Sequence, residues 1–512
     1  MIAVSPSLIP RIDAYATAIL GIPAYELMRR AGQAVAEVIA ESLPKRSTVL
    51  FYCGGGNNGG DGYAAACALH RMGYRALAVD LFGLAQRTEA GKAHLSAYRA
   101  AIGEPLSAEE AEVTEADCLV DALFGTGGRL PLPPASLPVA RRFRESKALR
   151  VAIDIPLGVN GESGEVFETV APADITVCPS FPKYGLYSYP AAQFVGRIVS
   201  NDLGLPRDIL EKHFSLTDTL SDEGLLRSAF PPREKNTHKG SFGHVLLLAG
   251  SPAYRGASIL SALSATALRS GSGLVTLASS GAVTDAVIPA VPEVITKAVL
   301  PWEEESSDRL LSLAERKSAV LIGPGCGASR ALARHIYAFL SCPGAPLILD
   351  ADALNSLSLD PTEAKKRLID AKRQVIFTPH PQEFARMTEN DTKTVQSRRL
   401  FSALSFTKEI PGVLVLKGAA TLICEGERFL INTTGGPSLA KGGSGDVLAG
   451  AVASLVGQGV PAFTAAGASA YLHGLAADRL TSLYSEYGVR PADLPDEMAK
   501  QLARVQRGED IR

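Results

Sequence analysis

The sequence lacks long hydrophobic runs, and no stretch reaches the roughly 18 uninterrupted apolar residues of a membrane-spanning helix. It also lacks an excess of one charge, since 51 basic and 53 acidic residues leave a formal net charge of -2. Without a strong positive field, the chain has little means of attracting nucleic acid or anionic lipid. We therefore expect small-molecule ligands, with no nucleic-acid partner and no membrane.

Cysteine is scarce. The seven cysteines are scattered, odd in number and never in a CxxC spacing, which is typical of free thiols in a reducing compartment. The start of the chain, MIAVSPSLIPRIDAYATAILG, has no basic region followed by an apolar run and a small-residue cleavage site. We therefore expect a cytoplasmic, unprocessed protein.

The 512 residues are too many for one hydrophobic core, so we expect two large domains. Short apolar runs that read as buried strands alternate with helical patterns in the first half. These runs are TVLFYC (48–53), RALAVDLFG (75–83), DCLVDALFG (117–125) and RVAIDIPLG (150–158). The alternation predicts a parallel sheet covered on both faces, with ligands bound beyond the carboxyl ends of its strands.

The alternation of strands and helices is interrupted at 218–235, where the sequence has mixed charge and a Pro-Pro pair. We therefore predict a linker at 218–235 between domains at 1–217 and 236–512. A second α/β alternation follows the break. Its predicted strands are GHVLLLAG (243–250), GLVTLAS (273–279), AVLIGPG (319–325), PLILDADAL (346–354), QVIFTPH (374–380) and GVLVLKG (412–418).

The glycine-rich turn GGGNNGGDG follows the first predicted strand. Its glycines permit close ligand approach, and the amides of the next helix point at the turn, so it predicts an anion cradle. The side-chain amides of Asn57 and Asn58 suit a phosphate, a ribose or a hard cation. A tight turn with glycines for geometry alone is the alternative.

Carboxylates stand on or beyond two further strands of the first half. Asp121 precedes the glycine-rich loop of DALFGTGGRL, and Asp154 lies at the mouth of a buried strand in AIDIPLG. A carboxylate in such a position is costly unless it has a partner or a chemical task. A turn cap is the alternative for Asp154. Lys183 could reach the same crevice or could be solvated.

In the second half, the nine residues GGSGDVLAG open a helix with Asp446 in its first turn. The helix N-terminus would stabilise a transferred anion, and Asp446 could accept a proton beside it. A simple N-cap, worth about 1 kcal/mol, is the alternative. His380 in TPHPQE is a weaker signal, which a catalytic or a structural role would explain. Lys417 in LVLKGAATLI is a weak signal for the binding of nucleotide phosphates. No segment matches the P-loop pattern.

In their order and spacing, these motifs resemble the bifunctional NAD(P)H-hydrate repair enzymes. GGGNNGGDG, DALFGTG and DIPLG are similar to the NAD(P)H-hydrate epimerase domain. HKGSFGHVLLLAGS, TPHPQE, LKGAAT and GGSGDVLAG are similar to the ADP-dependent (S)-NAD(P)H-hydrate dehydratase. The resemblance implies two α/β domains, an N-terminal Rossmann-like, parallel-sheet, three-layer domain and a C-terminal ribokinase-like α/β domain.

The resemblance also implies site residues, with Asp154 and Asp446 catalytic. The hydrate epimerase site would comprise Asn57, Asn58, Gly59, Gly60, Asp61, Gly125, Thr126, Gly127, Gly128, Arg129, Leu130, Pro131 and Asp154. A potassium ion would be held by Asn58, Asp121 and the backbone at Leu157. The dehydratase would bind substrate through Ala257, Gly325, His380 and Asp446. It would bind nucleotide through Lys417, Gly418, Ala419, Ala420, Thr421 and Gly445.

By the same resemblance, the enzyme interconverts the R and S epimers of NAD(P)H-hydrate (NADHX and NADPHX). It then dehydrates the S epimer to NAD(P)H, using ADP, with magnesium on the nucleotide, and releasing AMP and phosphate. A homo-oligomer is implied as well. Two residues depart from the family pattern, Leu157 where serine is usual and Gln382 where glycine is usual.

Two other interpretations of the sequence remain possible functions of this chain. A vitamin kinase fused to a Rossmann-like module would share the GSGD chemistry but would use ATP and a small alcohol. Alternatively, the first domain could be a non-enzymatic binding scaffold, although Asp154, Asn58 and the near-neutral charge weigh against this.

Overall fold

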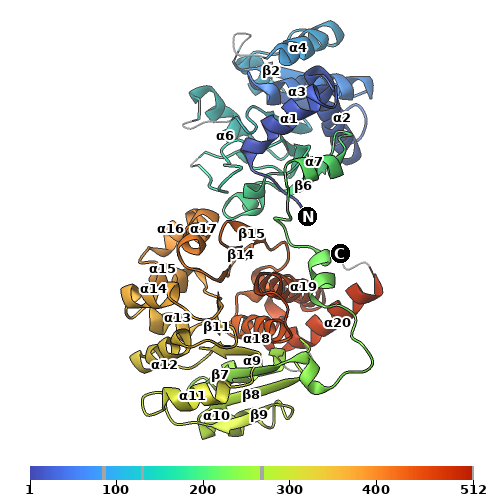
Figure 1. The fold of residues 1–512 in the computed structure, drawn as a ribbon. Helices are drawn as coiled ribbons and strands as arrows, with labels where there is room; N and C mark the ends of the chain where they lie inside the picture. The colour runs from blue at the N-terminus through green and yellow to red at the C-terminus, as the bar shows by residue number, and fades with distance from the viewer. Residues whose placement is uncertain (83–87, 128–131, 168, 266–269, 510–512) are drawn as a thin grey trace. The chain divides into compact units, whose positions relative to one another are not determined.

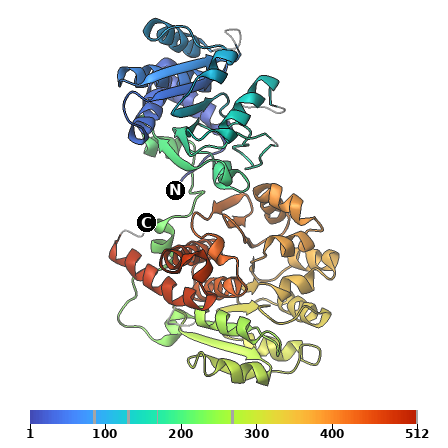
Figure 2. The same ribbon diagram turned by 180° about the vertical axis from the view of Figure 1, so that it is seen from behind.

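The computed structural model describes residues 1–512 except 83–87, 128–131, 168, 266–269 and 510–512 (Figures 1 and 2). Its contacts divide the chain into two compact units, Met1–Thr219 and Leu220–Arg512. No described helix is both long and apolar enough to cross a membrane.

Unit 1 is built on a six-stranded sheet in the order β2-β1-β3-β4-β5-β6, and every pair in it is parallel. The strands are β1 (Thr48–Cys53), β2 (Arg75–Asp80), β3 (Cys118–Ala122), β4 (Leu149–Ile153), β5 (Ile175–Pro179) and β6 (Arg197–Asn201). The helices are α1 (Ile9–Ala18), α2 (Ala24–Ser42), α3 (Asn57–Arg71), α4 (Glu89–Ala101), α5 (Ala108–Val113), α6 (Leu137–Glu145) and α7 (Arg207–His213).

Residues of β1 alternate between two cores, as the period of a strand requires. Val49 and Phe51 pack with residues of α2, α3 and α4 on one face, whereas Leu50 and Tyr52 pack with residues of α5 and α6 on the other. The sheet therefore lies between two helical layers, and the predicted three-layer fold is confirmed.

The direction in which strands are added to the sheet reverses at β1, which lies between β2 and β3. In sheets of this kind, ligands bind at such a reversal, beyond the carboxyl ends of the strands. The registers Cys53 with Ala122 and Asp121 with Ala152 bring the ends of β1, β3 and β4 to one edge. The three motifs of the first half therefore meet there.

Unit 2 is built on a nine-stranded sheet in the order β15-β14-β13-β12-β11-β10-β7-β8-β9. It is parallel from β13 to β9, and the β13–β14 and β14–β15 pairs are antiparallel. The strands are β7 (His244–Leu248), β8 (Leu274–Ser279), β9 (Ile295–Ala298), β10 (Ala319–Ile322), β11 (Leu347–Leu349), β12 (Val375–Phe377), β13 (Val413–Leu416), β14 (Leu422–Glu425) and β15 (Arg428–Ile431).

The helices of unit 2 include α18 and α19, which pack with α9 and α20 over one face of this sheet in a single core (Figure 1). The helices are α8 (Glu223–Ala229), α9 (Arg255–Ala265), α10 (Gly281–Val287), α11 (Ser307–Ala314), α12 (Arg330–Ser341), α13 (Asp352–Leu357), α14 (Pro361–Ile369), α15 (Pro381–Met387), α16 (Thr392–Ser397), α17 (Arg399–Glu409), α18 (Ser444–Gly457), α19 (Ala462–Gly488) and α20 (Leu494–Arg507).

The segment predicted as a linker, 218–235, has structure of its own. Helix α8 buries Leu226 in the core of unit 2, and Ser221 Oγ donates to Asn432 Oδ1 at 2.9 Å. The apolar residues of this segment are therefore part of unit 2, which begins at Leu220 by its contacts.

Two candidate active sites

The first candidate site lies at the reversal point of the unit 1 sheet. Asn58, in the first turn of α3, is buried and donates from Nδ2 to the Ile153 carbonyl at 3.1 Å. Its neighbour Asn57 is exposed and accepts from Thr88 Oγ1 at 2.8 Å. Asn58 therefore bridges the turn after β1 and the end of β4.

Gly125 closes this site from the loop after β3. A Cβ placed on Gly125 would lie 2.5 Å from Asp154 Oδ2 and 3.5 Å from Asn58 Oδ1. A side chain at position 125 would therefore collide with the carboxylate. Thr126 N donates to the same Oδ2 at 3.0 Å. The structure thus brings three of the predicted site segments together.

Asp154 also has a charged partner. Its backbone has a positive φ of 74°, and its Oδ1 forms an ion pair with the Nζ of Lys183. The side chain of Lys183 is 0% exposed. A solvated lysine is therefore excluded, and Asp154 does more than cap a turn, because it balances a buried ammonium group.

Two further carboxyls act on this pair. Burial would lower the pKa of Lys183, but the charge of Asp154, with smaller effects from Cys178 and Asp13, outweighs it and raises the pKa. Burial, and then Asp154 and Asp13, raise the pKa of Asp61 well above its usual range. Burial also raises the pKa of Asp13 to about 6, against the opposing charge of Lys183. Sequence reasoning did not single out Asp13.

The remaining residues of the first site can be placed in part. Gly59 and Gly60 are buried in α3, and Gly127 is exposed. Gly128, Arg129, Leu130 and Pro131 lie outside the described residues. A cavity of about 300 Å³ adjoins Gly125 and Thr126 and is also lined by Leu157.

The donor set at the predicted potassium site is poor. Both oxygens of the buried Asp121 carboxyl accept backbone N–H groups, Oδ1 from Leu123 at 3.1 Å and Oδ2 from Leu157 at 2.6 Å. Burial raises the pKa of Asp121 to about 6, although these two bonds oppose the rise. The Leu157 side chain has no oxygen. A potassium ion takes several oxygen ligands, so these residues fit it poorly.

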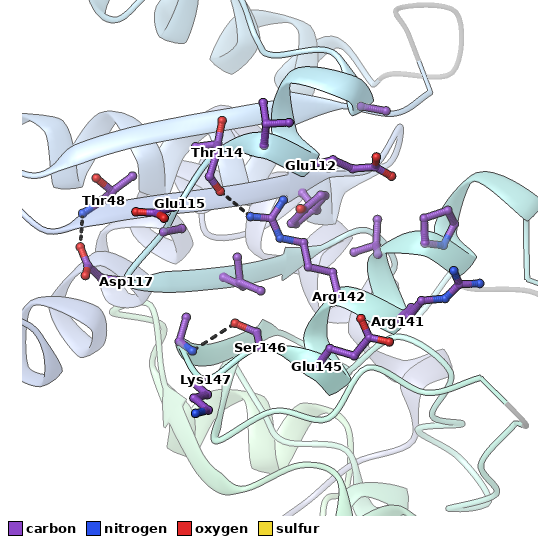
Figure 3. Close-up of a pocket in the computed structure, with 18 of the residues that line it drawn as sticks. Thr48, Glu112, Thr114, Glu115, Asp117, Arg141, Arg142, Glu145, Ser146 and Lys147 are labelled. Carbon is purple, nitrogen blue, oxygen red and sulfur yellow. Dashed lines mark hydrogen bonds between the residues drawn. The ribbon is translucent and has the colours of Figure 1, made fainter.

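A larger cavity of about 1100 Å³ in unit 1 lies elsewhere, between α5 and α6 (Figure 3). It is lined near the amino ends of the strands, where Thr48 N donates to Asp117 Oδ2 at 2.8 Å. Its basic side chains, including Arg141 and Arg142, are matched by acidic ones such as Glu112. It contains none of the motif residues.

The second candidate site is the N-terminus of α18 in unit 2. Gly443 is the N-cap, with a φ of 106° that favours glycine. Ser444 begins the helix, and Asp446 is its third residue. The interpretation of Asp446 as the N-cap is therefore wrong. The free amides of this turn are available to an anion.

Lys417 lies beside this turn, after β13. A Cβ on Gly445 would be 3.1 Å from Lys417 Nζ, which forms an ion pair with the buried Asp350 at 2.7 Å. Thr378 Oγ1 donates to the same Asp350 oxygen at 2.7 Å. Buried Arg399 donates to the Lys417 carbonyl at 3.2 Å. Lys417 is thus fixed at both its side chain and its backbone.

The burial and the neighbouring charges of this site raise the pKa of Asp446. Burial is the main reason that its pKa rises to about 7, and Asp350 raises it further whereas Lys417 lowers it. None of the hydrogen bonds among the described residues involves the Asp446 carboxylate. This carboxyl can therefore exchange a proton near neutral pH, as a general base must.

His380 is the N-cap of α15. Its Nδ1 accepts the backbone N–H groups of Gln382 at 3.1 Å and Glu383 at 3.3 Å. Its Nε2 lies 3.1 Å from Glu383 Oε1. Since Nδ1 is an acceptor, Nε2 carries a hydrogen and donates a hydrogen bond to the Glu383 carboxylate. Gln382 contributes through its backbone, so the departure from glycine leaves this cap intact.

The other predicted dehydratase residues fall into two groups. A Cβ on Gly325 would lie 2.8 Å from the Ala257 Cβ, so these two residues are neighbours. Residues 418–421 form the turn between β13 and β14, where Thr421 Oγ1 donates to the Gly418 carbonyl at 3.1 Å. Gly418 and Ala419 are exposed, and Ala420 has a φ of 51°.

Comparison with known proteins gives the same division of the chain. Residues 24–185 match the family model described as YjeF-related protein N-terminus, and residues 245–500 match that of NAD(P)H-hydrate dehydratase. The bifunctional NAD(P)H-hydrate repair enzyme Nnr of Moorella thermoacetica is 34% identical over 97% of this chain and 96% of the relative. The chain belongs to this family. The Escherichia coli K12 enzyme of the same name is 32% identical over 95% of this chain and 91% of its own.

A solved structure supports the assignment of unit 2 to the repair-enzyme family. The ADP/ATP-dependent NAD(P)H-hydrate dehydratase of Bacillus subtilis, co-crystallized with ATP and Mg²⁺, is 31% identical. It covers 57% of this chain and 99% of its own length, with a TM-score of 0.50. The α/β dehydratase domain that the motifs suggested for the second half is thereby supported.

Proposed function

We propose that this member of the repair-enzyme family interconverts the R and S epimers of NAD(P)H-hydrate in unit 1. In unit 2 it dehydrates the S epimer to NAD(P)H while ADP becomes AMP and phosphate. The observation that carries the proposal is the Asp446 carboxyl, which has no hydrogen-bond partner among the described residues. It adjoins the anion-binding turn Gly443–Gly445 and the fixed ammonium of Lys417.

The dehydration has a simple chemical logic. The hydroxide of the hydrate is a poor leaving group, so its oxygen first attacks the terminal phosphorus of ADP and displaces AMP. Asp446 accepts the hydroxyl proton, and the amides of Ser444 and Gly445 stabilise the charge of the moving phosphoryl group. The phosphate ester then breaks its C–O bond, a neighbouring proton leaves, and phosphate and the restored double bond remain.

Magnesium fits the same site. This ion keeps several waters and binds through one or two carboxylates together with substrate phosphates. Asp352 and Asp446 are partly exposed, and the charge of Asp352 acts on Asp446. The side chain of Asp352 would hold a magnesium–nucleotide complex, in which the ion would neutralise phosphate charge, and Asp446 would remain the base.

In unit 1, Asp154 and Lys183 form the acid–base pair. Epimerisation breaks and remakes a bond at the carbon that carries the hydroxyl, which requires one group to give a proton and another to take it. The ammonium of Lys183 and the carboxylate of Asp154 are in direct contact and are shielded from water. This arrangement supplies both functions, and no step requires potassium.

The test of the proposed function uses the purified chain and a mixture of the two hydrate epimers. Without ADP, we expect the epimers to interconvert with no NAD(P)H formed. With ADP, both epimers should disappear, with one AMP and one phosphate per coenzyme restored. An arm with ATP measures nucleotide preference. Turnover of ATP with a small alcohol, and none with the hydrate, would favour a vitamin kinase instead.

One prediction concerns Lys417. Its positive charge lowers the pKa of Asp446, so in Lys417→Met that pKa should rise. Because the base must be deprotonated, the acid limb of dehydration should move from near pH 7 in the parent to higher pH, and the maximal rate should fall. Lys417→Arg keeps the positive charge, so the acid limb should stay at the pH of the parent. A limb at the same pH in Lys417→Met and the parent would exclude this coupling.

A second prediction concerns Leu157. Its side chain offers no oxygen and the Asp121 oxygens accept backbone bonds, so epimerisation in the parent should depend little on potassium. Leu157→Ser adds a hydroxyl and should introduce such dependence. The measurement is the epimerisation rate against potassium concentration at constant ionic strength. If parent and Leu157→Ser saturate at the same concentration, the side chain at position 157 is not a ligand.

A further inference from the structure

Four ionisable side chains from four elements converge in unit 1. Lys183 follows β5, Asp154 follows β4, Asp61 lies on α3 and Asp13 lies on α1. The three carboxyls each interact electrostatically with Lys183, which also faces the Cys178 thiol. One buried ammonium is thus surrounded by three carboxyls, although the proposed reaction uses Asp154 as its partner.

The N-terminal segment is hydrogen-bonded to the residues on both sides of Lys183. Val4 N donates to the Pro182 carbonyl at 2.8 Å, and Tyr184 N donates to the Val4 carbonyl at 3.2 Å. Val4 therefore pairs with Lys183 as a short parallel bridge. The segment that leads into α1 is therefore fixed by backbone hydrogen bonds to Pro182 and Tyr184, the residues on either side of the lysine.

Helix α1 is anchored by packing as well. Ile12 and Ala16 are both 0% exposed and lie in the same apolar cluster as Phe181, two residues before Lys183. Asp13 is adjacent to Ile12, so the packing of this face limits where its carboxyl can lie. With a pKa of about 6, Asp13 is mostly ionised at neutral pH.

A buried ammonium group is costly without an opposing charge. Asp154 supplies that charge at rest, but a carboxylate that takes up a proton during turnover loses it. We propose that Asp13 is a positioning residue of the epimerase reaction, whose carboxylate is the second counter-charge of Lys183 and holds the ammonium in place while Asp154 exchanges a proton. The inference rests on the proposed epimerase function.

This role of Asp13 predicts the direction in which the pH profile of epimerisation should move when the carboxylate is removed. Loss of a negative charge makes every nearby acid release its proton more easily. In Asp13→Asn, both limbs of the pH profile of epimerisation should therefore move to lower pH, by about one unit for the loss of one nearby charge. On the plateau between the two limbs, kcat should fall about tenfold because the ammonium is no longer held in place, with KM changed less than about twofold.

The experiment measures epimer interconversion without ADP, by NMR, from pH 4 to pH 11, so that the alkaline limb of Lys183, whose pKa is raised, falls within the range. Asp13→Glu keeps the charge and should stay close to the parent. Glu37→Gln removes an exposed carboxylate from α2 of the same unit and should superimpose on the parent, because solvent screens that charge. ADP-dependent dehydration of the S epimer, measured on the same samples, should be unchanged in all variants.

An Asp13→Asn profile that superimposes on the parent, or limbs that move in opposite directions, would overturn the role of Asp13. So would an Asp13→Glu profile equal to that of Asp13→Asn. If Asp13→Asn and Asp13→Ser both lose the thermal transition of unit 1, Asp13 is a stability residue and the inference fails. A parent protein that does not interconvert the epimers refutes the proposed function itself.

Discussion

Asp446→Ala is expected to abolish ADP-dependent recovery of NAD(P)H while leaving epimer interconversion at the parent rate. The side chain stands at the third position of α18, beside the amides that would hold the phosphoryl group. Its pKa of about 7 suits proton transfer near neutral pH. Removal of a positioned base costs about 10²- to 10⁴-fold in rate. The measurement is NAD(P)H formation from the S epimer with saturating ADP.

The control for Asp446→Ala is another carboxylate in the first turn of a helix of the same unit. Asp308 lies in the first turn of α11 and is exposed, so Asp308→Ala should lose a favourable helix-dipole interaction of about 0.5 kcal/mol and no activity. Asp446→Asn keeps the shape of the side chain and should be as inactive as Asp446→Ala. Near-normal dehydration in either Asp446 variant would remove Asp446 from the mechanism.

The fold class could be predicted because the central strands of both sheets are apolar on both faces. Runs such as VLLL in β7 and VLVL in β13 are continuous, which is the pattern of parallel strands buried between helices. The loops after them are rich in glycine and carry the polar residues. Both the sheet class and the edge that holds the site therefore follow from the sequence.

Several of the strands outside the predicted runs lack this pattern. Among them, β6 and β9 are edge strands with partly exposed residues and no apolar run, as in ITKA. The antiparallel hairpin of β14 and β15 joins LICE to RFLI through a two-residue turn. Its short strands carry charged ends, and the pairing of β14 with β13 is decided by tertiary contacts, which local periodicity does not report.

The site residues that were missed depend on long-range contacts. Asp13 lies on α1, and its electrostatic interaction with Lys183 spans about 170 positions of sequence. Similarly, Asp350 meets Lys417 across 67 positions. A pairing of this kind appears once the sheet orders its strands, so the sequence could indicate a carboxylate beyond a strand without naming its partner.

Asp154→Ala is expected to stop epimerisation while ADP-dependent dehydration of the S epimer continues. Its carboxylate balances Lys183 and lies against Gly125 and Thr126. In a mixture of epimers, about half of the hydrate should then be repaired quickly, and the remainder at the slow uncatalysed rate of epimer exchange. The measurement follows both epimers in time with excess ADP.

Because Asp154→Ala leaves an uncompensated buried ammonium, part of its effect could be lost stability of unit 1, at about 3 to 5 kcal/mol for a broken buried pair. Asp154→Asn and the double variant Asp154→Asn, Lys183→Met separate the two effects. The double variant removes both charges and should regain thermal stability while remaining inactive. Asp202→Ala, at the exposed end of the parallel strand β6, should behave as the parent. If both epimers disappear at the parent rate in a folded Asp154 variant, the acid–base pair of unit 1 lies elsewhere.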